Sequence, residues 1–195
     1  MAGPIVPRAE ERRSNSSPMT AGVLLAFAAG VISAVAYSTL EQFVIPFRGE
    51  REFALDRQGI AGLLMIVQGV DVVCLLPFGR LVDRFGVGHV LGPTLVVFGV
   101  GTVLTALGSF AFVIAGCLLF GVGLAGWPLP LGLLRRETPP DQIGWRTAIY
   151  RVGVDGGIFL GPLLSGFLAG HAAGLLPITC AAALLAVGCL IAVRR

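Results

Sequence analysis

Six long apolar segments, separated by short polar stretches, dominate the hydropathy pattern of the chain. They cover residues 20–45, 58–78, 89–107, 110–134, 147–169 and 173–193. A helix needs about 20 apolar residues to cross roughly 30 Å of hydrocarbon, and each segment meets or nearly meets this length. A membrane β-barrel would show short alternating segments instead. The pattern therefore predicts an all-α membrane protein, with six transmembrane helices over residues 20–195.

The composition agrees with lipid as the solvent of these segments. Hydrophobic residues make up 55% of the chain, charged residues 13%, and the mean hydropathy is +0.88. A soluble domain with this composition would lack the polar surface it needs. The net charge of +3 comes from arginines near segment ends, which does not indicate nucleic-acid binding. The cysteines lie inside apolar segments without metal-binding spacing, so we expect no disulfide, metal or cofactor.

The polar ends of the chain and the short loops predict its orientation. Residues 1–19 are polar and turn-prone, which is typical of a disordered tail or linker. Residues 34–36 have the form of a signal-peptidase site, but the apolar run is too long for a signal peptide, so we expect the first helix to remain. If the helices alternate, one side carries the arginines at 12–13, 80, 84, 135–136, 146 and 194–195. The positive-inside rule then places both termini in the cytoplasm.

The polar stretch after the second segment reads Gly79-Arg80-Leu81-Val82-Asp83-Arg84-Phe85-Gly86. Glycines at both ends permit tight turns, and the carboxylate of Asp83 suits the positive N-terminal end of a neighbouring helix. The stretch resembles the GxLaDRxG loop between the second and third helices of each half in the major facilitator superfamily. The resemblance implies a cytoplasmic latch, weakened here because residues 87–88 lack the family's basic pair. The latch residues would be Gly79, Arg80, Asp83, Arg84 and Gly86.

The fifth segment contains Gly157-Ile158-Phe159-Leu160-Gly161-Pro162-Leu163-Leu164-Ser165-Gly166, which is similar to the GxxxGPxxGG pattern of the same superfamily. Small residues four positions apart allow close helix contact, and a proline bends a helix, so ordinary packing is an alternative explanation. Together the two matches imply one six-helix half of a major facilitator transporter, more like the C-terminal half. We expect helix-packing or gating roles for Gly157, Gly161, Pro162 and Gly166.

Charged residues inside the apolar segments are candidates for function, because a carboxylate in hydrocarbon costs at least about 2.5 kcal/mol. Asp71 lies roughly 10 Å inside the expected end of the second helix, with Gln68 one turn away on the same face. The pair is the first candidate for coupling or substrate contact, and a structural hydrogen bond to a neighbouring helix is the alternative. Asp155 follows Arg151 by four residues, so the two side chains either neutralise each other or exchange partners with a proton or a cationic substrate.

Three other features have simpler interpretations. Glu41 lies about 6 Å from the expected outer end of the first helix and is interpreted as a rim residue. Trp127 and Trp145 are interpreted as residues of the membrane interface. Pro128 and Pro130 predict a break or bend in the fourth helix.

The family resemblance implies a secondary active transporter, not an enzyme. We expect a multi-pass protein of the cytoplasmic (inner) cell membrane that moves a small organic solute by proton-coupled efflux. A second six-helix half, from a homodimer or a separate chain, would complete the pathway. One alternative is a truncated or accessory half without transport of its own. A remote alternative is an intramembrane serine protease, because Ser165-Gly166 matches a fragment of a GxSG motif. No pattern in the sequence specifies the substrate.

Overall fold

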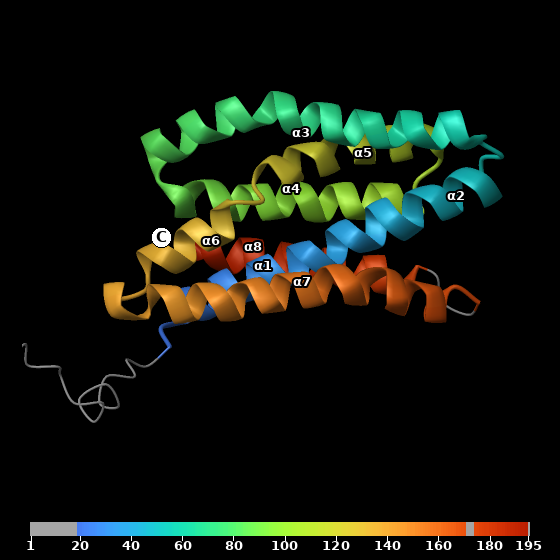
Figure 1. Cartoon of the computed structure of the whole chain (residues 1–195). Helices are drawn as coiled ribbons and strands as arrows, with labels where there is room; N and C mark the ends of the chain where they lie inside the picture. Colours follow the sequence, from blue (N-terminus) through green and yellow to red (C-terminus); the bar gives the residue numbers. More distant parts are fainter. Residues whose placement is uncertain (1–18, 171–173, 195) are drawn as a thin grey trace, which may run out of the picture.

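The computed structural model describes residues 19–170 and 174–194, which fold as a bundle of helices (Figure 1). The first rod consists of α1 (Ala21–Thr39), a π-helical stretch, η2 (Leu40–Val44), and α2 (Ile45–Arg51). Its start is fixed by Thr20, whose hydroxyl oxygen accepts a hydrogen bond from the Val23 amide at 3.3 Å. Most of the predicted tail at 1–19 lies outside the described residues.

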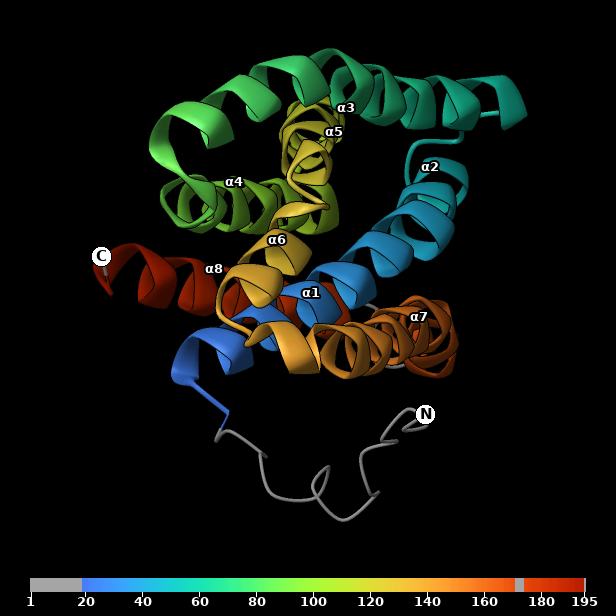
Figure 2. The same ribbon diagram turned by 60° about the vertical axis from the view of Figure 1, so that its left-hand side comes forward.

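The remaining helices follow with short connections. They are α3 (Arg57–Phe85), α4 (Val87–Leu107), α5 (Phe110–Ala125), α6 (Leu129–Arg136), the 3₁₀ turn η3 (Pro140–Gln142), α7 (Ile143–Leu168) and α8 (Leu175–Val193). No strand occurs in the described ranges, so the predicted all-α class is confirmed. α1 packs against α7 and α8, α4 against α5 and α8, and α3 against α5. α3 and α7 thus lie on opposite sides of the bundle (Figures 1 and 2).

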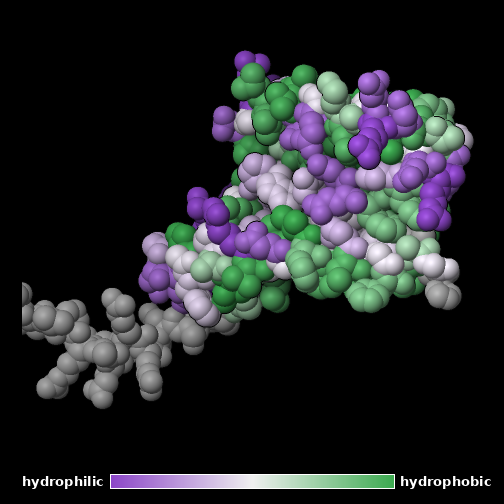
Figure 3. All heavy atoms as spheres, turned by 45° about the vertical axis from the view of Figure 1, so that its right-hand side comes forward, coloured by the Kyte–Doolittle hydropathy of each residue, from purple (hydrophilic) through white to green (hydrophobic). Residues whose placement is uncertain are grey.

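Five segments in the described part are long and apolar enough to cross a membrane. They are Ala21–Arg51, Arg57–Phe85, Val87–Leu107, Phe110–Arg136 and Leu175–Val193. The sequence predicted six spans. The sixth, α7, is long enough but not apolar enough to be counted with these five. This helix has 26 residues, but it also contains Arg146, Arg151 and Asp155, which lower its mean hydropathy. Hydrophobic side chains cover much of the surface in Figure 3, with hydrophilic groups in patches between them.

Several helices extend beyond the apolar segments that predicted them. The first rod runs to Arg51 instead of ending at residue 45, and α3 runs to Phe85 instead of ending at residue 78. Helix α7 likewise begins at Ile143, four residues earlier than expected. Charged residues stop an apolar run, but they do not stop a helix that continues into water, where side chains are free to be polar.

The fourth span is interrupted, as the prolines predicted. α5 ends at Ala125 and α6 begins at Leu129, with Gly126, Trp127 and Pro128 forming the connection. Proline lacks an amide hydrogen and cannot continue the hydrogen-bonding pattern of the preceding helix. Trp127 lies in this break, and its side chain packs against the core of the bundle.

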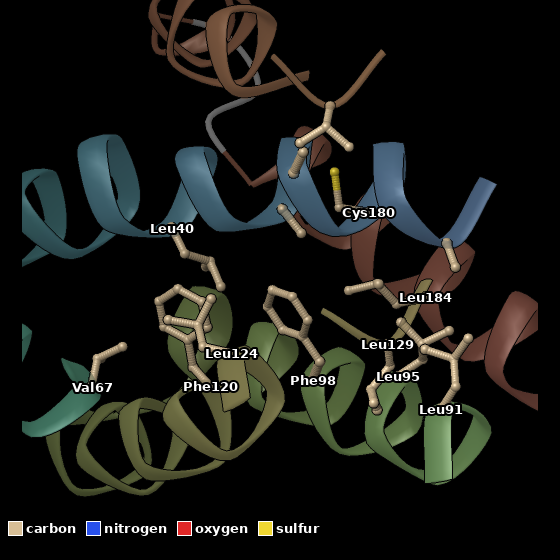
Figure 4. Packing of buried hydrophobic residues seen from close by; sticks show 14 of the residues in the cluster. Leu40, Val67, Leu91, Leu95, Phe98, Phe120, Leu124, Leu129, Cys180 and Leu184 are labelled. Carbon is tan, nitrogen blue, oxygen red and sulfur yellow. The ribbon is translucent and has the colours of Figure 1, made fainter. Parts of the chain in front are cut away.

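The core lies between α1, α4, α5 and α8 (Figure 4). Phe98 of α4 and Phe120 of α5 are almost fully buried, and their rings stack with centroids 5.3 Å apart. Leu40 from the first rod and Leu184 from α8 are fully buried in the same cluster. Lipid offers no hydrophobic drive for helix association, so this close van der Waals packing holds the bundle together.

At the opposite end from the α3–α4 turn, Arg48 joins two helices. Its guanidinium donates to the Glu52 carboxylate at 2.6 and 2.8 Å, and to the carbonyl oxygens of Thr105 at 2.6 Å and Gly108 at 2.8 Å. The last carbonyl groups of a helix have no partner within it, so Arg48 supplies hydrogen bonds that α4 lacks. The arginine ties the end of the first rod to the end of α4.

Candidate functional site

Two cavities of about 350 Å³ each share lining residues at the break between α5 and α6. The first lies beside α3 and is lined by Tyr37, Gln68, Asp71, Leu75, Leu124, Trp127 and Pro128. The second lies beside α7 and is lined by Trp127, Pro128, Leu131, Tyr150, Arg151, Val154, Asp155 and Ile158. Trp127 and Pro128 belong to both, so we treat the two cavities as one groove. All four sequence-predicted coupling residues line it.

Asp71 is the central residue of the 29-residue helix α3. At about 1.5 Å per residue it lies roughly 20 Å from either helix end. One of its carboxylate oxygens is buried without a hydrogen-bond partner. A polar atom buried in this way is costly unless water, a proton or a ligand satisfies it.

Glu41 contacts a residue that lines the first cavity. The Gln68 amide nitrogen donates to a carboxylate oxygen of Glu41 at 3.1 Å, which links α3 to the first rod. Because that rod runs on to Arg51, Glu41 lies roughly 15 Å from its end, and its carboxylate contacts a neighbouring helix there. The residue stands in the π-helical stretch η2, a distortion often found at functional sites.

The aromatic residue at the junction of the two cavities is Trp127. Its ring meets that of Tyr37 edge to face, with centroids 5.5 Å apart and planes at 66°. Trp127 thus packs against α1 and lines both cavities, whereas Trp145 is 69% exposed. The signal in the sequence was the Gly126-Trp127-Pro128 turn, which places an aromatic residue at a helix break.

Arg151 and Asp155 both face the second cavity from α7, and both are exposed within this chain. Within the described residues, no ion pair joins the guanidinium of Arg151 to the carboxylate of Asp155. Mutual neutralisation, the simpler alternative from the sequence, is not what the structure shows. Two separate charges inside a membrane would require a polar surrounding, because hydrocarbon would accommodate neither.

A family model described as Major Facilitator Superfamily matches residues 19–194, nearly the whole described chain. The chain belongs to the Major Facilitator Superfamily. It is also similar to the Bacillibactin exporter of Bacillus subtilis (strain 168), with 29% identity over 83 residues. The aligned part covers 40% of this chain and 21% of the exporter. No solved structure matches the chain. Members of this superfamily are membrane transporters that carry small solutes, not enzymes.

The superfamily motif at 79–86 adopts a different local structure from the expected loop. Residues 79–85 form the last two turns of α3, and the chain turns at Gly86 alone, which has a φ of 81°. Gly79 stands inside the helix with open space around it, so its predicted role in a turn is wrong. Arg80, Asp83 and Arg84 are exposed at this end of the bundle.

The glycine pattern of this superfamily member brings α7 against α1. A Cβ atom on Gly157 would lie 3.1 Å from the Val31 carbonyl oxygen, and one on Gly161 would overlap the Ser38 hydroxyl. Gly166 has nothing within 4 Å of such an atom, so the structure gives it no packing contact. Pro162 lies within α7 and the helix continues past it.

Ser165 is buried, and its hydroxyl donates to the Gly161 carbonyl oxygen of its own helix at 2.7 Å. A nucleophilic serine needs a base within hydrogen-bond reach, and this bond turns the hydroxyl proton to the backbone. His171, the histidine nearer to Ser165 in the sequence, lies outside the described residues.

Proposed function

We propose that the groove is one wall of the solute pathway in a secondary active transporter. The observation that carries the proposal is the convergence of Asp71 from α3 and Asp155 from α7 on cavities that meet at Trp127. Carboxylates inside a membrane mark ion or substrate pathways, because they are too costly to retain without use. Membership of a transporter superfamily supports the same conclusion.

The groove suits coupling to protons. Asp71 has a buried oxygen without a partner, and a proton bound there would remove the charge that makes this depth unfavourable. Glu41 and Gln68 form a polar contact between the first rod and α3, so a change in charge on one helix alters its interaction with the other. Arg151 and Asp155 supply separate charges on α7 for a polar or ionic solute. The similarity to an exporter favours efflux as the direction.

A second six-helix half would supply the other wall. Both cavities of the groove open to the surface of this chain, and α3 has only Leu63 and Val67 buried within it. In transporters of this kind the two halves insert in the same orientation, so a second copy or a separate chain fits geometrically. We propose that α7 is the sixth span, that the arginine-rich end faces the cytoplasm, and that the protein resides in the inner membrane. The motifs favour the second half.

The substitution Asp71→Asn tests this function in proteoliposomes that contain a trapped pH-sensitive dye. A panel of small organic solutes is added, and solute-dependent proton movement is recorded. The original protein is expected to give a signal with at least one solute, and Asp71→Asn is expected to abolish it. Glu50→Gln, at an exposed position outside the groove, should leave the signal unchanged. Full proton movement by a correctly folded Asp71→Asn variant would remove Asp71 from the mechanism.

An accessory half without transport of its own is the second candidate, and the open side of the groove is the observation that favours it. The native mass in mild detergent separates the two functions. A dimer, or a complex with a second membrane protein, is expected for the transporter. A strict monomer with no proton movement for any solute would favour the accessory role.

A further inference from the structure

Two cavities outside the groove meet at His89, at the end of the bundle where α3 turns into α4. The larger one, about 580 Å³, lies between the first turn of α1 and the ends of α6 and α8, and its charged residues are Arg136, Glu137 and Arg194. The smaller one, about 330 Å³, lies mainly between α3 and α4, and almost all of its wall is apolar. Since His89 lines both, a polar cavity and an apolar cleft stand side by side.

The charge that the larger cavity presents is positive. The Glu137 carboxylate lies over Gly22, 2.7 Å from where a Cβ atom would be, and there it meets the positive N-terminal end of α1. One guanidinium nitrogen of Arg136 lies 3.5 Å from the Cβ position of Gly86, so this arginine stands at the turn between the cavities. Neither Arg136 nor Arg194 forms an ion pair within the described residues.

The apolar cleft opens to the surface of this chain. Leu81 and Phe85 on its wall are 43% and 54% exposed, and its floor is formed by α4 and Val122 of α5. The helix ends around both cavities lie at one end of the bundle (Figures 1 and 2). A hydrocarbon chain fits such a cleft, because the bilayer supplies no other solvent there. Basic pockets between transmembrane helices bind anionic lipid headgroups.

We propose that the two cavities together bind one anionic phospholipid. Its phosphate lies beside Arg136, Arg194 and His89, and one acyl chain lies in the cleft between α3 and α4. The lipid is a bound partner that joins the α3–α4 turn to the end of α6, and it is not the transported solute. The site is separate from the groove and does not depend on the proposed transport.

Native mass spectrometry of the purified full chain in detergent tests the site. Phosphatidylglycerol and phosphatidylcholine with the same acyl chains are added at equal concentration. The protein is expected to retain phosphatidylglycerol preferentially. The double substitution Arg136→Gln and Arg194→Gln is expected to weaken that retention about 30-fold, since each arginine near a membrane surface contributes roughly fivefold. The matched control Arg51→Gln and Arg57→Gln removes two exposed arginines at the other end and should change nothing.

Two further variants test the charge of the site and the cleft for the acyl chain separately, and the first also controls for a folding defect. Arg136→Lys keeps the charge and should retain the lipid within about threefold, which guards against a folding defect in the double variant. Val97→Phe fills the apolar cleft and should weaken phosphatidylglycerol retention, with unchanged binding of inorganic phosphate. Equal retention of both lipids, unchanged retention in the double variant, or displacement of phosphatidylglycerol by inorganic phosphate at equal concentration would each overturn the proposal.

Discussion

Replacing Gly161 by alanine tests whether the contact between α1 and α7 fixes the wall of the groove. The added Cβ atom would overlap the Ser38 hydroxyl and would lie 2.9 Å from the Val35 carbonyl oxygen and 3.0 Å from the Thr39 amide nitrogen. Two of these three atoms belong to the α1 backbone, so they move only if the helices separate. Gly156 is the matched control, because nothing lies within 4 Å of a Cβ atom at that position.

The expected difference between the two variants is large enough to measure. Overpacking of a tight contact costs about 1–3 kcal/mol. Alanine also favours a helix over glycine by roughly 1 kcal/mol, and Gly156→Ala gains this term without a clash. Gly161→Ala should therefore be about 1–3 kcal/mol less stable than Gly156→Ala. The double variant Ser38→Ala and Gly161→Ala removes the overlapping hydroxyl and should recover part of the loss.

The assay is unfolding of the purified protein from a mild detergent by titration with sodium dodecyl sulfate, followed by circular dichroism. The midpoint is expected to fall for Gly161→Ala and to stay or rise for Gly156→Ala. Equal midpoints for the two variants would refute the inferred close approach of α7 to α1. No recovery in the double variant would show that Ser38 is not the obstructing group.

Two further predictions concern the ends of the bundle and the junction of the groove. Arg48→Ala removes two charge-assisted hydrogen bonds to the end of α4 and should lower stability by about 2 kcal/mol in the same titration, whereas Arg57→Ala should have little effect. Trp127→Ala opens the wall that both cavities share and should abolish solute-dependent proton movement, whereas Trp145→Ala, at an exposed position, should not. Full stability of Arg48→Ala would contradict the stabilising role of its hydrogen bonds to α4. Full proton movement by Trp127→Ala would contradict the role of Trp127 as a shared wall of the groove.

The sequence predicted the helical segments well but their ends poorly. Apolar runs report where the chain meets lipid, and the backbone continues as a helix beyond that boundary. The charged residues Arg48 and Arg51 indicated a loop, yet they stand on the last helical turns of the first rod. For the same reason the motif at 79–86 is mostly helix, with a turn only at Gly86.

The candidate site was predictable only where a single residue was anomalous. Asp71 and Asp155 are charged within apolar segments, so each was identified from its own position. Glu41 contacts Gln68 of α3, and Trp127 contacts Tyr37 of α1 at the groove; no local pattern encodes either contact. The Gly126–Pro128 break was foreseen, but its effect on the direction of the tryptophan depends on how α5 and α6 pack.

The most direct test of the groove as a water-accessible pathway is the labelling rate of two neighbouring cysteines in membranes. Leu75 lines the groove, whereas the adjacent Leu76 is 76% exposed within this chain but lies outside the two cavities. Leu75→Cys and Leu76→Cys are made in a variant without the four native cysteines and treated with a charged, water-soluble thiol reagent. Only a thiolate in contact with water reacts. We predict faster labelling of Leu75→Cys, and equal or reversed rates would contradict the assignment of the groove.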